Sequence, residues 1–190
     1  ETLLGPDHSH TLIVRDELIR WQGESGDPAG AAVSARLLLA DRVRLHGADH
    51  VGTLHTRGSL ARWQGEAGDA AGAVAATRSL LTDRLRIQGA DHRATLTTRH
   101  NLGYWRGESG DPAGAAVAFE KLLADMIRVL GPDHPDKLTT RNDLAWWRGK
   151  AGDPAAAAAE LRALLPDRQR VLGLDHPHAL ITRNDLAWWE

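Results

Sequence analysis

The segment LAWWRGKAGDPAAA, residues 144–157, decides how this chain folds. Forty-two residues earlier the chain reads LGYWRGESGDPAGA, and the same framework returns twice more toward the N-terminus. A Leu, a small residue or Ile, a Trp and a Gly-Asp pair keep their places in these copies. Recurrence at a fixed interval is the signature of a repeat architecture.

Four columns of residues keep the 42-residue interval without an insertion or a deletion. The columns are Gly5, Gly47, Gly89, Gly131 and Gly173; Arg15, Arg57, Arg99, Arg141 and Arg183; Leu18, Leu60, Leu102, Leu144 and Leu186; and Trp21, Trp63, Trp105, Trp147 and Trp189. They predict four repeats, at about 5–46, 47–88, 89–130 and 131–172, with a half repeat at 173–190 and the tail of an earlier unit at 1–4. Because the chain starts at Glu1 and not at Met, we expect a fragment of a longer protein.

Each repeat is predicted to be a hairpin of two helices. In the fourth repeat Asp133 or His134 caps a helix, and Gly152 ends it in a left-handed conformation. Asp153 caps a second helix, which Gly173 ends. The link between the two helices is so short that they must run antiparallel.

One hairpin cannot bury the apolar stripes of both helices, but stacked hairpins can. Small residues stand where neighbouring backbones would approach closely. These are Ala31, Ala73, Ala115 and Ala157 on the second helices, and Ala61, Gly103, Ala145 and Ala187 on the first helices. The Trp column supplies the large partner. We therefore predict an all-α solenoid of nine helices with a 42-residue repeat.

Composition excludes several classes of function. The net charge of -2 argues against a nucleic-acid partner, and the absence of Cys excludes disulfides, thiolate zinc sites and a cysteine nucleophile. No apolar run approaches the length that spans a membrane. We expect a cytoplasmic protein with no cofactor, no membrane association and no nucleic-acid ligand. The excess of Arg over Lys, with much Ala and Gly, suggests a GC-rich bacterial genome.

The pattern of Leu144, Ala145, Trp147, the Gly152-Asp153 turn and Ala157 resembles the tetratricopeptide-repeat signature. The longer unit, with the linker Gly-Pro-Asp-His-Pro at 131–135, is similar to the kinesin light chain branch of that family. The resemblance implies a right-handed superhelix whose first helices line a concave face. It also implies a non-catalytic scaffold that binds proteins or peptides. The unit departs from the family in its length, since the usual period is about 34 residues.

Positions that vary from repeat to repeat on the implied concave face are the candidate peptide-binding residues. One column runs Arg20, Arg62, Tyr104, Trp146 and Trp188, and these residue types are enriched at binding hot spots. A second column runs Asp16, Gly58, His100, Asn142 and Asn184, and His55 belongs to the column nearest the helix start. Two alternatives stay open: Glu24 and Glu66 pair with the Arg residues internally, or the Trp residues only fill contacts between helices.

The Asp-His pairs are the most tempting catalytic feature. They are Asp7–His8, Asp49–His50, Asp91–His92, Asp133–His134 and Asp175–His176. Five equivalent copies favour a structural role, with the Asp capping a helix and the His bonding a carbonyl. The His-x-His patterns at 8–10 and 176–178 stand at opposite ends of the array and cannot pool the ligands that zinc needs. We expect neither a catalytic nor a metal site.

Charged columns accompany the apolar ones. Asp41, Asp83, Asp125 and Asp167 recur on the second helices, each followed three residues later by an Arg (Arg44, Arg86, Arg128 and Arg170). We predict that each Arg of the Arg15 column bonds an Asp of a neighbouring helix, in two-pronged geometry where possible. The alternative is a solvated surface pair that contributes little to stability. Because this Arg stands between core Leu positions, we favour a buried pair.

Three functions remain for such an array. The first is a protein- or peptide-binding scaffold. The second is self-assembly by end-to-end stacking, because the last helix would expose Leu186 and Trp189. The third is a sensor or regulatory segment of a larger signalling NTPase, which the resemblance implies. No arrangement of residues supports an enzyme.

Overall fold

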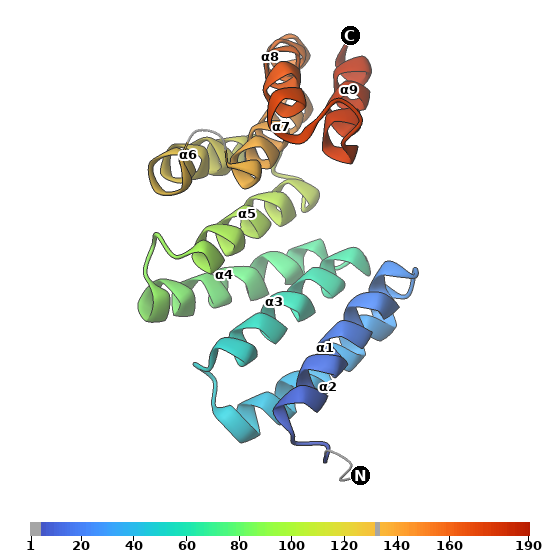
Figure 1. Ribbon diagram of the computed structural model, residues 1–190, viewed down its shortest axis with the longest axis vertical. Coiled ribbons are helices and arrows are strands. Elements are labelled where there is room, and N and C mark those ends of the chain that lie inside the picture. The colour runs from blue at the N-terminus through green and yellow to red at the C-terminus, as the bar shows by residue number, and fades with distance from the viewer. Residues whose placement is uncertain (1–4, 132–133) are drawn as a thin grey trace. The chain divides into compact units, whose positions relative to one another are not determined.

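The computed structural model describes residues 5–131 and 134–190, and these residues form nine α-helices and no strand (Figure 1). The helices are α1 (Ser9–Glu24), α2 (Pro28–His46), α3 (Val51–Glu66), α4 (Ala70–Gln88), α5 (Arg93–Glu108), α6 (Pro112–Leu130), α7 (Pro135–Lys150), α8 (Pro154–Leu172) and α9 (Pro177–Trp189). Each begins 42 residues after its counterpart in the preceding repeat, so the predicted helix pairs are confirmed. The expected tail of a second helix at 1–4 lies outside the described residues.

The second helix of each hairpin starts as predicted. The carboxylate of Asp153 accepts a hydrogen bond from the backbone N–H of Ala156 at 3.0 Å, and Asp27, Asp69 and Asp111 do the same in their repeats. Gly152 precedes this cap with a φ of 107°, a left-handed conformation that favours glycine. The Gly-Asp pair therefore makes the turn that reverses the chain.

The first helices are capped by His, which corrects the prediction for the Asp-His pairs. The Nδ1 atom of His134 accepts a hydrogen bond from the N–H of Asp136 at 3.2 Å. His8, His50, His92 and His176 act in the same way. The backbone is extended at His8, His50, His134 and His176. This conformation turns each ring back over the first turn of its helix.

The preceding Asp stands one residue too early to serve as the cap. Asp7 and Asp49 instead accept hydrogen bonds from Arg44 and Arg86 of the second helix, at 2.7 Å in both repeats. Asp133, which was also considered as a cap, lies outside the described residues.

The chain divides into two compact units, residues 1–98 and 99–190, with the boundary inside α5. In the first unit α2 packs against both α1 and α3, and α3 packs against α4. In the second unit α7 packs against α6, α8 and α9, and α8 also packs against α9. Within each unit, successive helix hairpins therefore stack as the all-α solenoid prediction requires.

A Trp ring set against a bare Gly backbone joins consecutive first helices. A Cβ added to Gly107 would come within 2.5 Å of the Trp147 ring, and one added to Gly149 would come within 2.6 Å of Trp189. Trp63 lies over Gly23 in the same way. The Trp column was predicted to be large core residues, but the matching Gly column was not recognised. The sequence does indicate this column, because a Gly recurs inside the first helices at the 42-residue interval.

The small-residue columns lie where the sequence places them. Ala31, Ala73, Ala115 and Ala157 are completely buried on the second helices. Ala61, Gly103 and Ala145 are buried on the first helices, whereas Ala187 of the last helix is exposed. The core is therefore a sequence of joints in which small residues of one helix receive the large residues of its neighbours.

The Trp–Gly joint predicts a sharp difference between two glycines of first helices. Gly107→Ala should lower the free energy of unfolding by about 1–3 kcal/mol, because the new methyl group overlaps Trp147. Gly58→Ala is the matched control: its nearest neighbour would be Leu80 at 3.6 Å, so the higher helix propensity of Ala should stabilise the chain by up to about 1 kcal/mol. Urea denaturation measures both changes, and equal effects of the two substitutions would contradict the joint.

Candidate functional site

The cationic end of the predicted binding column is paired internally. Arg20 bonds Glu17 at 2.5 Å and Glu24 at 3.3 Å, and Arg62 lies 4.0 Å from Glu24. The two guanidinium groups also stack over Trp rings, 4.5 Å from the centroid of Trp21 for Arg20 and 4.3 Å from that of Trp63 for Arg62. The internal pairing that was left open for these Arg residues is confirmed for Glu24.

The aromatic end of the same column forms a surface cluster, which we call the aromatic patch and define as Trp146, Lys150 and Trp188. The ring centroids of Trp146 and Trp188 lie 6.3 Å apart. The Lys150 ammonium lies 4.9 Å from the centre of the Trp146 ring and 5.7 Å from that of Trp188. Trp188 is 65% exposed, although it is one of the largest apolar side chains of the unit. The patch therefore places exposed aromatic surface from α9 and a positive charge from α7 side by side.

The Tyr104 ring packs against two buried Trp rings of the same unit. Its ring centroid lies 4.9 Å from that of Trp105 and 6.2 Å from that of Trp147, both of which are buried. Tyr104 is half-buried and packs on the structural Trp residues. Within the second unit the predicted column therefore consists of Tyr104, which packs on buried Trp rings, the half-buried Trp146 and the exposed Trp188.

The second predicted column mostly holds consecutive first helices together. The carboxylate of Asp16 pairs with Arg42 and accepts a hydrogen bond from Thr56 at 3.3 Å, while the His55 ring lies 3.6 Å from it. His55 itself is exposed on α3, and Asn184 is exposed on α9.

In the second unit two more members of this column contact the next first helix. The His100 ring bonds Asp143 at 2.7 Å. Asn142 is only 5% exposed and donates to Asp185 at 2.6 Å. Burial raises the pKa of the Asp185 carboxyl above its ordinary value. These polar side chains lie in the joints between repeats, so most of their hydrogen-bonding capacity is already used.

Three buried guanidinium groups were missed by the sequence analysis: Arg42, Arg84 and Arg168, on α2, α4 and α8. Each donates from Nη2 to a carbonyl of the preceding first helix, namely that of Leu12, Leu54 or Leu138, at 3.1, 3.4 and 3.1 Å. The available signal was an Arg recurring at 42-residue spacing inside the apolar stripe of the second helix, interrupted once by Met126.

The Arg15 column pairs with the Asp41 column as predicted. The distances are 2.7 Å for Arg15–Asp41, 2.6 Å for Arg57–Asp83, 2.8 Å for Arg99–Asp125 and 2.6 Å for Arg141–Asp167. The expectation of burial is wrong, because these side chains are between 22% and 40% exposed. The position borders the apolar stripe, and a long Arg stem lets the charged group reach the surface.

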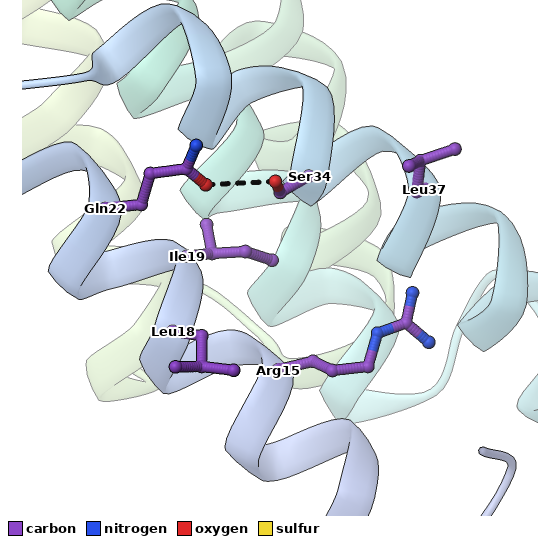
Figure 2. Close-up of a pocket in the computed structure, with 6 residues that line it drawn as sticks. All are labelled: Arg15, Leu18, Ile19, Gln22, Ser34 and Leu37. Carbon is purple, nitrogen blue, oxygen red and sulfur yellow. Dashed lines mark hydrogen bonds between the residues drawn. The ribbon is translucent and has the colours of Figure 1, made fainter.

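A cavity of about 270 Å³ opens between α1 and α2. It is lined by Arg15, Leu18, Ile19, Gln22, Ser34 and Leu37 (Figure 2). Across it the hydroxyl of Ser34 donates a hydrogen bond to the Gln22 side chain at 3.0 Å. Leu18 and Leu37 are exposed here, whereas Leu60, the counterpart of Leu18 one repeat on, packs into the core that α2 covers. The cavity therefore lies on the surface of the first hairpin that corresponds to the surface of the second hairpin covered by α2.

Within residues 5–131 and 134–190, no three His, Asp or Glu side chains lie close enough together to hold a metal ion. The rings of His8 and His10 lie 5.3 Å apart, as do those of His176 and His178. Over the same residues, no helix has both the length and the apolar character needed to cross a membrane.

The known proteins that this chain resembles are also built from repeats. A family model described as a tetratricopeptide repeat matches residues 95–136 and 138–178. A crystal structure of a Podosopora anserina protein described as a kinesin light chain with nearly identical TPR-like repeats has a TM-score of 0.78 and 21% identity, covering 98% of this chain and 87% of its own. BtubC (BKLC) from P. vanneervenii has a TM-score of 0.78 and 16% identity, covering 95% and 72%. No curated protein matches the sequence.

The four ion pairs between the Arg15 and Asp41 columns predict a loss of stability in acid. Hydrogen bonds from Arg15, Arg57, Arg99 and Arg141 hold the pKa values of their Asp partners below the ordinary value. Their stabilisation is complete above the unfolded-state pKa of about 4 and is lost as the pH falls through the lower folded-state pKa.

We therefore expect the melting temperature to fall between pH 6 and pH 3, and to fall less in Arg99→Met, where Asp125 has lost this partner. Arg99→Ala serves as the control that also removes the packing of the side-chain stem. Thermal unfolding followed by circular dichroism at the two pH values measures the difference. An identical acid-induced fall of the melting temperature in the wild type and in both variants would show that the Arg–Asp pairs contribute nothing to stability.

Proposed function

We propose that this chain, whose units are tetratricopeptide repeats of the kinesin light chain kind, is a non-catalytic scaffold that binds a protein or peptide ligand. The family model and the structural similarity confirm the resemblance that residues 144–157 carry. A role in protein interaction is the general property of such arrays, whose stacked hairpins present an extended surface of side chains. The proposal adds where on this chain the ligand binds.

The aromatic patch is the observation that carries the proposal. Trp188 exposes most of its indole, and Trp146 beside it is half-buried, so the pair combines a fixed ring with an accessible one. Aromatic anchors of this kind contribute most of the binding energy at protein interfaces. Lys150 keeps both rings beside a positive charge. The ligand would pack an apolar side chain on the indoles and place a polar group near the ammonium.

The other predicted site residues take different parts in this proposal. Asn184 stays in the site, because it is exposed on α9 four residues before Trp188 and shares its side of the helix. Asp16, His100 and Asn142 position the first helices through the contacts described above. Arg20 and Arg62 are neutralised by nearby Glu side chains, so a ligand would have to displace a carboxylate to reach them.

Self-assembly is a second candidate, favoured by the exposed apolar surface around the cavity between α1 and α2. Leu18 and Leu37, which line this cavity, are each about 60% exposed, and so is Trp21 of α1. Association of two copies through this face would cover these side chains. The scaffold function is preferred, because the aromatic patch combines an exposed indole with a neighbouring positive charge. The regulatory segment of a larger NTPase stays a prediction.

Selection from a displayed library of random 12-residue peptides tests the scaffold proposal. We expect the wild-type chain to enrich peptides whose affinity falls at least about 10-fold in Trp188→Ala, a loss typical of an interface hot spot. Trp146→Ala should weaken the same peptides. Binding is measured by isothermal titration with the selected peptides.

Trp21→Ala is the matched control, because Trp21 is 60% exposed but lies on α1 in the other unit. It should leave the affinity unchanged. Selected peptides that bind both Trp188→Ala and Trp146→Ala as well as the wild type would contradict the proposal. So would a selection that enriches no peptide.

A further inference from the structure

Each buried Arg of a second helix faces the residue 26 positions earlier on its first helix. Arg42 faces Asp16 and forms an ion pair with its carboxylate. Arg168 faces Asn142 and donates to its amide oxygen at 3.2 Å. Arg84 faces Gly58, which offers no side chain at all. One repeat therefore buries the cation without the partner that its equivalents have.

The three guanidinium groups share one contact, which sets the register of the comparison. Each donates its Nη2 to the carbonyl 30 residues earlier, that of Leu12, Leu54 or Leu138. For Arg84 the bond to Leu54 is long, at 3.4 Å. Because the register is the same, Gly58 occupies the place beside Arg84 that Asp16 occupies beside Arg42.

Arg84 is poorly satisfied by the rest of the chain. It is 9% exposed, its Nε–H is buried with no hydrogen-bond acceptor, and its bond to Leu54 is its only hydrogen bond within residues 5–131 and 134–190. Arg168 also has an orphaned Nε, but its Nη1 bonds Asn142, Thr182 and the carbonyl of His178. Burial lowers the pKa of Arg84, and the positive charge of Arg57 lowers it further. A buried cation without a counter-charge is costly.

The third repeat shows the other solution to the same problem. Its residue at this position is Met126, which faces His100, and the His bonds Asp143 of the next first helix. In this repeat an apolar side chain replaces the buried cation. The second repeat keeps the charge and removes the facing side chain, which leaves space: a Cβ built on Gly58 would have Leu80 as its nearest neighbour, at 3.6 Å.

We propose that Arg84 is the base of an anion site that takes a carboxylate through the space beside Gly58. The incoming carboxylate would do for Arg84 what Asp16 does for Arg42. Its source is either a small free carboxylate anion or the acidic side chain of a bound ligand, since both present the same group. The site lies within the first unit and does not rest on the aromatic patch.

The Nε–H resonances of a chain labelled with ¹⁵N-arginine report on the site directly. The Arg84 signal is assigned by its loss in Arg84→Met, a substitution that copies Met126 of the third repeat. Sodium formate is added at constant ionic strength against sodium chloride. We expect the Arg84 signal to move along a saturable curve while that of Arg42, whose carboxylate is internal, stays in place.

A second titration distinguishes the two sources of the carboxylate. N-acetylaspartate N-methylamide carries an acidic side chain on a blocked backbone, and N-acetylasparagine N-methylamide is its uncharged control. Saturation by formate alone supports a site for free anions. Saturation by the aspartate compound as well, but not by its asparagine control, supports a site that admits a ligand side chain.

Substitutions at Gly58 complete the test. Gly58→Asp should abolish the response to formate and raise the melting temperature, because the new carboxylate pairs with Arg84 internally. Gly58→Ala is the matched control and should keep the response. The proposal is overturned if the Arg84 signal does not respond in saturable fashion to formate or to the aspartate compound, which would mean that water alone satisfies the guanidinium. It is also overturned if Gly58→Asp responds like the wild type.

Discussion

The contact between a Trp ring and the bare backbone of a Gly in the preceding repeat is the constraint on which the rest of the structure depends. It sets how closely consecutive first helices approach, because any side chain at Gly23, Gly107 or Gly149 would occupy the volume of the indole. The second helices then close the joint with their buried Ala column. Since each joint involves only neighbouring repeats, stability is the sum of many similar local terms rather than the property of one central core.

This way of packing decides which side chains remain for a ligand. Polar residues between consecutive first helices, such as Asp16 and Asn142, are used to pair buried Arg residues and to hold the next helix. Repeats that share one framework can still differ at these positions. The exposed Trp188 with its neighbouring Lys150, and the unpaired guanidinium side of Arg84, are two such differences, one in each unit. Function in this chain is therefore expected where a repeat departs from its own pattern.

Much of the fold follows from the sequence because its determinants are local and recur. The Gly152-Asp153 turn specifies a left-handed residue and a helix cap without any help from distant contacts. The errors arose where the outcome depends on tertiary geometry. Whether Asp or His caps a first helix depends on a one-residue offset, and the Arg15 column lies at the edge of the apolar stripe, where its depth cannot be deduced from periodicity. The burial of Arg84 becomes visible only when the hairpins are stacked, and so does the importance of Gly58, which gives it no partner.

The helicity of a single excised repeat, residues 47–88, compared with that of the whole chain tests the central claim most directly. This fragment contains Trp63 but neither Gly23, over which the ring packs, nor the neighbouring hairpins. If the joints between repeats hold the fold, far-ultraviolet circular dichroism will show the fragment to be mostly unfolded at 25 °C, whereas the whole chain melts cooperatively. A fragment with the full helical signal and a cooperative melting transition of its own would contradict the account.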